Sequence, residues 1–331
     1  MKNKLFQLTI AKLKRLKHSS IRLFQKLILW LNRNQILTSI ESIGALPTPF
    51  FIVAMPGCLC ELILCVKHFN NKRPLVIIDN GLSDWEANWL RNWNHNLKTI
   101  QFASETLNHD LIIDTLINNF DSQFGILDYD CFIFDTDLLE KLDHLASDEM
   151  ISALFCQTDN DLGLFSPETF IAVLNPTVIR PLQKEFSASS RAIYYDQLTP
   201  EQKSALLKIG IDRDHPIEKY KGYFDTTRLW VCLGYAKGLR VKFIKRLNTR
   251  DADGVFHVGA GTSHTNLNRY WTKRGTWFWR RALEECPYQD LREYYYQKYG
   301  PLTTQDVLKQ VPEIKSQLGD VYFENVEKIV R

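Results

Sequence analysis

Short apolar runs alternate with amphipathic stretches over much of the chain from residue 49 onward. Runs typical of buried strands occupy residues 49–55, 74–79, 97–102, 124–135, 151–157, 168–174 and 240–246. Helical periodicity is found at residues 58–69, 83–93, 109–120, 198–210 and 225–238. Ser83 followed by Glu86 is a helix-start signal. This alternation predicts an α/β fold with a mixed, mostly parallel sheet flanked by helices.

The first 40 residues have a different pattern. Residues 3–33 predict an amphipathic helix, with apolar positions at Phe6, Ile10, Leu13, Phe24 and Leu27 and a surface rich in lysine and arginine. Such a helix can lie on an anionic membrane surface. The alternatives are docking on the body of the protein, docking on a second copy of the chain, and an organelle transit peptide.

Charge separates this segment from the rest. Residues 1–40 contain nine lysines and arginines and no acid, so the other 291 residues carry −6 of the total charge of +3. A basic footprint on the body itself is typical of nucleic-acid-binding proteins, and we therefore expect no nucleic-acid partner. We expect the 331 residues to divide into a basic helix (1–40), a linker (41–48), a main α/β domain (49–265) and a helical C-terminal extension (266–331).

Composition predicts a cytoplasmic protein, peripheral on the inner face of the cell membrane if the N-terminal helix binds lipid. No apolar run reaches the length of a spanning helix or of a signal peptide followed by a cleavage site. The seven cysteines have mostly apolar neighbours and are expected to be reduced. Cys58, Cys60 and Cys65 match no common zinc spacing.

The stretch Asp128-Tyr-Asp130 is the strongest candidate for chemistry. Two carboxylates two residues apart lie at the polar end of an apolar run, where open α/β sheets bind ligands. Carboxylate oxygens suit Mn²⁺ or Mg²⁺, and such an ion stabilises a leaving diphosphate. Solvated aspartates at a strand end are the alternative explanation.

Three segments in order resemble the GT-A glycosyltransferases of bacteria. They are VIIDNGLSDWEANWL, LDYDCFIFDTDLLEKL and FHVGAGTS, and the resemblance covers about residues 50–265. It implies a GT-A fold and a metal-dependent hexosyltransferase that uses a nucleoside diphosphate sugar and a glycan or lipid-linked acceptor. Asp128, Asp130 and His257 would bind the metal, and Asp128 also the donor phosphates.

The same resemblance implies further site residues. Gly259, Gly261 and Ser263 would let backbone amides approach the diphosphate, and Asp79 and Asn80 would lie near the nucleotide. Asp225 would be the general base of an inverting enzyme, or otherwise a helix cap.

Two departures and two rival functions remain open. FSPETFIAVLNP lacks the family's Asn-x-Gly, and Ala260 replaces a usual glycine. CFIFDTDLLE resembles the first motif of haloacid-dehalogenase-type phosphatases, with Asp135 as nucleophile and Asp137 as acid. A catalytically degenerate glycosyltransferase-like scaffold is the non-enzymatic alternative.

Overall fold

A computed structural model gives the architecture of the chain. It describes residues 20–44, 46–69, 73–95, 97–135, 137–156, 162–217, 222–247, 254–259, 270–299 and 319–331. The strands are β1 (Phe50–Ala54), β2 (Leu75–Asn80), β3 (Lys98–Ala103), β4 (Phe124–Leu127), β5 (Cys131–Ile133), β6 (Glu149–Cys156), β7 (Ser166–Leu174), β8 (Ile193–Tyr194), β9 (Tyr223–Phe224), β10 (Arg240–Leu247) and β11 (Val255–His257).

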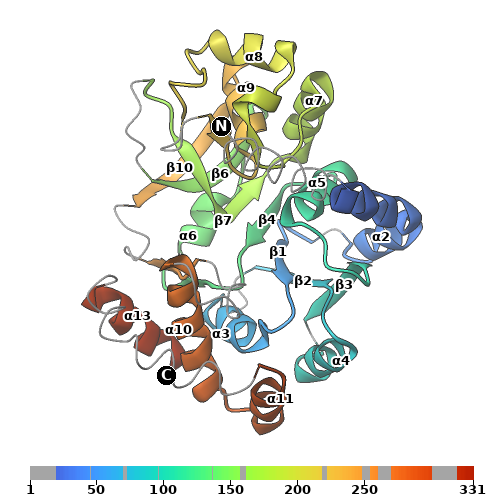
Figure 1. Cartoon of the computed structure of the whole chain (residues 1–331), viewed down its shortest axis with the longest axis vertical. Helices are drawn as coiled ribbons and strands as arrows, with labels where there is room; N and C mark the ends of the chain where they lie inside the picture. Colours follow the sequence, from blue (N-terminus) through green and yellow to red (C-terminus); the bar gives the residue numbers. More distant parts are fainter. Residues whose placement is uncertain are drawn as a thin grey trace, which may run out of the picture.

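A seven-stranded sheet with the order β10-β6-β7-β4-β1-β2-β3 forms the centre of the molecule (Figure 1). Strands β4, β1, β2 and β3 are parallel neighbours, and β10 is parallel to β6. Strand β7 is antiparallel to both β4 and β6. The predicted mixed, mostly parallel sheet is confirmed.

Helices cover both faces of this sheet. They are α2 (Arg33–Glu41), α3 (Leu59–Phe69), α4 (Asp84–Trp93), α5 (His109–Asn119), α6 (Asp137–Leu142), α7 (Pro176–Phe186), α8 (Pro200–Leu207), α9 (Arg228–Ala236), α10 (Tyr270–Glu284), α11 (Gln289–Tyr299) and α13 (Asp320–Val330), with a 3-10 turn at Tyr195–Gln197. Helices α3, α10, α11 and α13 share one core, and α5, α7 and α9 share the other.

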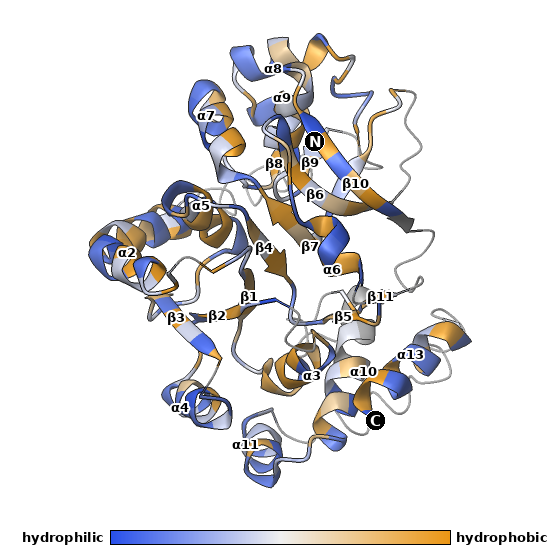
Figure 2. Cartoon of the chain, turned by 180° about the vertical axis from the view of Figure 1, so that it is seen from behind, coloured by the Kyte–Doolittle hydropathy of each residue, from blue (hydrophilic) through white to orange (hydrophobic). Residues whose placement is uncertain are grey.

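Burial on both faces explains why the central strands are continuously apolar. In β1, Phe50 and Ile52 belong to the core on the α3 side, and Phe51 belongs to the core on the α5 side. Strand β4 is coloured hydrophobic in Figure 2, whereas the edge strand β10 alternates with hydrophilic residues. Charged residues on an edge strand hinder pairing with another chain.

The single apolar run predicted at 124–135 is two strands instead of one. Strand β4 ends at Leu127, and β5 leaves the large sheet to pair with β11 in an antiparallel two-stranded sheet. The turn between them contains both aspartates of the Asp-x-Asp motif, and Cys131 N donates to Asp128 O at 3.0 Å to close it.

Part of the predicted N-terminal helix lies outside the described residues, which begin at residue 20. The described part is helical over residues 20–31, and α2 follows. No helix among the described residues is long and apolar enough to span a membrane. Six of the seven cysteines have a described side chain, and all six are buried: Cys58, Cys60, Cys65, Cys131, Cys232 and Cys286.

Candidate metal and nucleotide site

The two aspartates lie where β4 leaves the central sheet. Asp128 N donates to Phe170 O at 2.8 Å, which continues the pairing with β7 for one residue beyond β4. Asp128 and Asp130 therefore lie at the carboxyl end of a strand in the middle of the sheet, where α/β proteins commonly bind ligands.

The pairing of β11 with β5 brings His257 to the same place. His257 is the register partner of Cys131, and Val258 N donates to Asp130 O at 3.0 Å. The imidazole stacks on the Phe170 ring, with centroids 4.2 Å apart and planes at 19°. These contacts fix the ring beside the aspartates before any ligand binds.

The three side chains converge closely. His257 Nε2 lies 3.4 Å from Asp128 Oδ2 and 3.4 Å from Asp130 Oδ1. One ligand atom from each residue lies within 4.8 Å of the others, and no other described group of three or more such residues does so. Two hard oxygen donors and one imidazole nitrogen are a donor set that fits a divalent cation such as Mn²⁺ or Mg²⁺.

The two aspartates raise the pKa of His257. Burial alone would lower the pKa of His257, but the negative charge of Asp130 and the hydrogen bond with Asp128 outweigh it and raise the pKa to about 9. Asp130 is only 7% exposed at its side chain, whereas Asp128 is 35% exposed. Two carboxylates this close favour either a cation between them or a proton on one of them.

A cavity of about 390 Å³ opens at these residues. It is formed mainly by the carboxyl ends of β1, β2 and β4, by the segment between β3 and α5, and by β11. Its lining residues are Val53, Met55, Asn80, Thr106, Leu107, Asn108, His109, Asp128, Tyr129, Asp130 and His257.

Asn80 holds one wall of the cavity in place. Its Oδ1 accepts from Leu107 N at 2.8 Å and its Nδ2 donates to Leu107 O at 3.0 Å. The neighbouring Asp79 does not line the cavity, because its carboxylate turns to Leu82 N at 3.0 Å. Of the predicted pair, Asn80 lies at the cavity and Asp79 stabilises the turn after β2.

The other predicted site residues are more scattered. Asp225 is exposed, its carboxylate accepts from Thr226 N at 2.8 Å, and it is not among the described residues that line the cavity. The predicted helix cap is also displaced, because α9 begins at Arg228 with Thr227 as its N-cap. Gly259 is described, with a φ of 70°, whereas Gly261 and Ser263 lie outside the described residues.

The aspartates of the rival phosphatase motif stand apart from this site. Asp135 Oδ1 accepts from Asp137 N at 3.1 Å, at the start of α6, as a helix cap does. Neither residue is among the described residues that line the cavity. The contacts of this pair are those of a structural turn.

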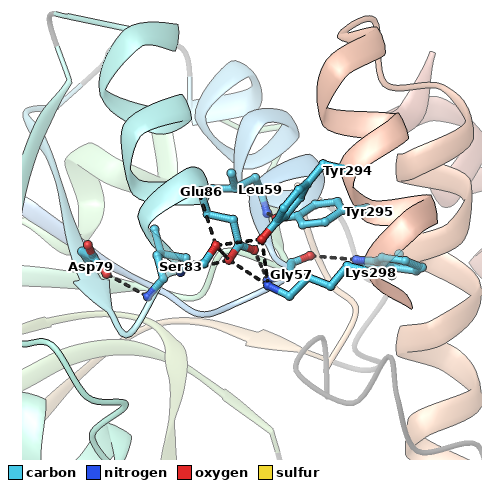
Figure 3. Close-up of polar contacts among 10 residues, drawn as sticks. Gly57, Leu59, Asp79, Ser83, Glu86, Tyr294, Tyr295 and Lys298 are labelled. Carbon is cyan, nitrogen blue, oxygen red and sulfur yellow. Dashed lines mark hydrogen bonds and ion pairs between the residues drawn. The ribbon is translucent and has the colours of Figure 1, made fainter. Parts of the chain in front are cut away.

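Glu86 is the centre of a polar network (Figure 3). The sequence predicted its helix-capping contact with Ser83 but not its contacts with more distant residues. The predicted capping box is present, with Ser83 and Glu86 bonded reciprocally. The buried carboxylate of Glu86 also accepts from Gly57 N at 2.7 Å, Tyr295 Oη at 3.0 Å and Lys298 Nζ at 3.2 Å. It thereby joins α11 to the β1–α3 loop, which follows the cavity residue Met55.

Glu61 is a second acidic residue that the sequence did not single out. Its side chain on α3 is fully buried, and neither carboxylate oxygen has a hydrogen-bond partner. Burial, and then the charge of Asp130, raise the pKa of Glu61 well above its ordinary value. The raised pKa favours the protonated form of Glu61.

One family model matches part of the chain. Residues 33–179 match the family model described as the StrH glycosyltransferase N-terminal domain. The resemblance to glycosyltransferases is confirmed for this segment. The match contains Asp128 and Asp130 and ends before His257, so the third side chain comes from the part of the chain beyond it. No curated protein matches the chain.

Several solved structures are distantly similar. 4-Diphosphocytidyl-2C-methyl-D-erythritol synthase from Anaerococcus prevotii DSM 20548 is 8% identical with a TM-score of 0.36, over 61% of this chain and 90% of that one. Bifunctional IspDF from Campylobacter jejuni is 8% identical with a TM-score of 0.32, over 60% and 49%. The glycosyltransferase GlyE from Streptococcus pneumoniae TIGR4 is 7% identical with a TM-score of 0.36, over 76% and 64%. The chain thus spans less than two thirds of the last two.

Proposed function

We propose that the chain transfers a hexose-type unit from a nucleoside diphosphate sugar to a hydroxyl group of a glycan or lipid-linked acceptor. The observation that carries this proposal is the convergence of Asp128, Asp130 and His257 on one cavity at the carboxyl end of the sheet. The glycosyltransferase family match over residues 33–179 supports the reaction class. The cavity volume of about 390 Å³ falls within the usual range for small-molecule sites.

Asp128, Asp130 and His257 would hold Mn²⁺ or Mg²⁺. When bound, such a cation stabilises the negative charge that develops on the leaving nucleoside diphosphate. The protein's own contribution is to fix its ligands in advance: Phe170 orients the imidazole, and Val258 N holds the Asp130 backbone.

The remaining roles follow the same proposal. Asn80 and the wall that it holds would contact the nucleoside, and backbone amides at Gly259, Gly261 and Ser263 would contact the diphosphate. Asp225 is our candidate for the general base that deprotonates the acceptor. Residues 49–265 would form the catalytic domain and residues 266–331 a helical extension.

The test measures metal binding and donor turnover separately. Purified full chain is titrated with MnCl₂ by electron paramagnetic resonance and incubated with a panel of UDP- and GDP-hexoses. We expect Asp130→Asn to weaken Mn²⁺ binding by more than about tenfold, since even indirect partners of a ligand are worth that much, and to abolish Mn²⁺-dependent release of the nucleoside diphosphate. Asp135→Asn is the matched control and should leave both unchanged.

Three outcomes contradict the proposal. Wild-type Mn²⁺ affinity in the Asp128→Asn, Asp130→Asn double variant would remove the metal site. Loss of activity with Asp135→Asn, but not with Asp130→Asn, would favour the phosphatase. A chain that binds neither nucleotide nor metal would be a scaffold.

A further inference from the structure

The helix at residues 20–31 presents its apolar side chains to solvent. Leu23, Phe24, Leu27, Trp30 and Leu31 are each between 50% and 71% exposed. With 3.6 residues per turn, these five positions fall within an arc of about 120° on one side of the helix. We call this surface the apolar stripe.

The opposite side of the same helix meets the body through polar and apolar contacts. The Arg22 guanidinium forms a buried ion pair with the Asp110 carboxylate. Gln25 Nε2 donates to Thr106 O at 3.0 Å. These bonds, together with Ile28 and Leu29 packed against the core, attach the helix, drawn dark blue beside α5 and α2 in Figure 1. The outward direction of the apolar stripe is therefore set by specific contacts with the body.

Helix α2 has the ordinary orientation for a surface helix. It buries Ile36 and Ile40 in the core shared with α5. Residues 20–31 also pack Ile28 and Leu29 against that core, but the five side chains of the apolar stripe stay exposed. An exposed arc of five large apolar side chains indicates an interaction surface.

Charge indicates what covers the apolar stripe. Lys26 is exposed and lies within about 60° of its edge, and the exposed Arg33 follows this helix at the start of α2. They belong to a segment with nine cations and no acid before Glu41. Packing two copies stripe to stripe would bring two such segments together, whereas an anionic surface attracts them.

We propose that the apolar stripe inserts into the headgroup region of an anionic phospholipid bilayer, with Lys26 and Arg33 at the lipid phosphates. Leucine, phenylalanine and tryptophan on one side of a basic helix are the composition of such interfacial helices. This docking does not depend on the catalytic activity proposed above.

Docking would also place the cavity near the membrane. The buried side of the helix contacts Thr106 and Asp110, and residues 106–109 form one wall of the cavity. A hydroxyl acceptor carried on a lipid would then reach the donor without leaving the bilayer. This second step rests on the proposed transferase function.

The experiment is co-sedimentation of the full chain with vesicles of phosphatidylcholine alone or with about a quarter phosphatidylglycerol. We expect binding to the anionic vesicles only. The triple variant Leu23→Gln, Leu27→Gln, Trp30→Gln should lower the partition coefficient at least about tenfold, because it removes three apolar side chains from the bilayer.

A matched control variant replaces three exposed apolar side chains on other surfaces of the molecule. Tyr194→Gln, Leu207→Gln and Val321→Gln replace residues that are 54%, 56% and 56% exposed, and this variant should bind as wild type does. Asp130→Asn should also bind normally, so that a failure of docking and a failure of the transferase proposal can be distinguished.

The following results would overturn the docking proposal. Equal binding by wild type and the Leu23, Leu27, Trp30 variant would mean that the stripe does not meet lipid. If the wild type does not bind to anionic vesicles, the docking proposal is also wrong. A dimer in light scattering that this variant converts to a monomer would identify the stripe as an interface between two copies.

Discussion

Replacing Glu86 by glutamine should loosen the attachment of α11 to the cavity side of the molecule. Glutamine has the same shape, but only one of its two terminal atoms accepts hydrogen bonds. Glu86 Oε1 accepts from Gly57 N and Tyr295 Oη, and Oε2 accepts from Ser83 N, Ser83 Oγ and Lys298 Nζ. If the amide nitrogen of glutamine takes the place of Oε2, it cannot accept from the donors Ser83 N, Ser83 Oγ and Lys298 Nζ.

The expected cost follows from those contacts. Two bonds to a charged, fully buried carboxylate are lost at Ser83, each worth about 1.5 kcal/mol or more, for a total of about 3 kcal/mol. Lys298 adds little, because its side chain is 33% exposed and returns to water. For a chain of this size, about 3 kcal/mol lowers Tm by about 6 °C.

The pH dependence gives this prediction a sign. Burial would raise the pKa of Glu86, but hydrogen bonds from Ser83 and Gly57 and the charge of Lys298 outweigh it, so the pKa is lowered. A lowered pKa stabilises the fold above the ordinary carboxyl value of 4.5, and that stabilisation is lost as the pH falls below it. The difference in stability between wild type and Glu86→Gln should therefore disappear in acid.

Thermal unfolding followed by circular dichroism at pH 7.5 and at about pH 3 measures the difference in Tm and its loss in acid. Hydrogen exchange in α11 should rise in the variant. Glu293→Gln, on the exposed side of α11, is the matched control, because that carboxylate is exposed and accepts from Gln289 Nε2 at 2.7 Å, within its own helix. An unchanged Tm, or a gap that persists in acid, would refute the reasoning.

Three further substitutions test the surroundings of the cavity. Glu61→Gln should raise thermal stability at pH 7.5, and its advantage should grow as the pH rises above 4.5, because the raised pKa makes the wild type lose stability in that direction. Gly81→Ala should lower stability by about 1–2 kcal/mol and weaken nucleotide binding, since φ is +81° and a Cβ would lie 2.5 Å from Thr106 Oγ1. Asn80→Asp should weaken nucleotide binding measured by calorimetry and cost about 1–3 kcal/mol in chemical unfolding, because the donor to Leu107 O is lost.

Local patterns in the sequence were sufficient to predict most strands of the sheet. Strands buried on both faces must be apolar throughout, so β1, β2 and β4 are visible as continuous runs. The Ser83–Glu86 spacing located the start of α4, because a capping box depends only on neighbouring residues. Asp128 and Asp130 were visible as candidates for the same reason, since they end an apolar run, and their metal role stays a prediction.

Other features depend on contacts between distant segments. The break between β4 and β5 is set by the turn at Asp128 and by pairing with β11, neither of which changes the apolar pattern. Hydrophobic periodicity shows that residues 20–31 have two sides but not which side meets the body. That choice is made by Asp110 and Thr106, about 80 residues later. The role of Glu86 beyond its cap likewise depends on Tyr295 and Lys298.

The attachment of helix 20–31 to the cavity wall affects how any shortened form of this protein should be interpreted. A chain that starts after residue 31 would lose Arg22 and leave the buried carboxylate of Asp110 without its counterion. It would also free the Thr106 carbonyl at the wall of the cavity. Reduced activity of such a chain could reflect damage to the cavity, so only substitutions on the outer side of the helix separate lipid contact from folding.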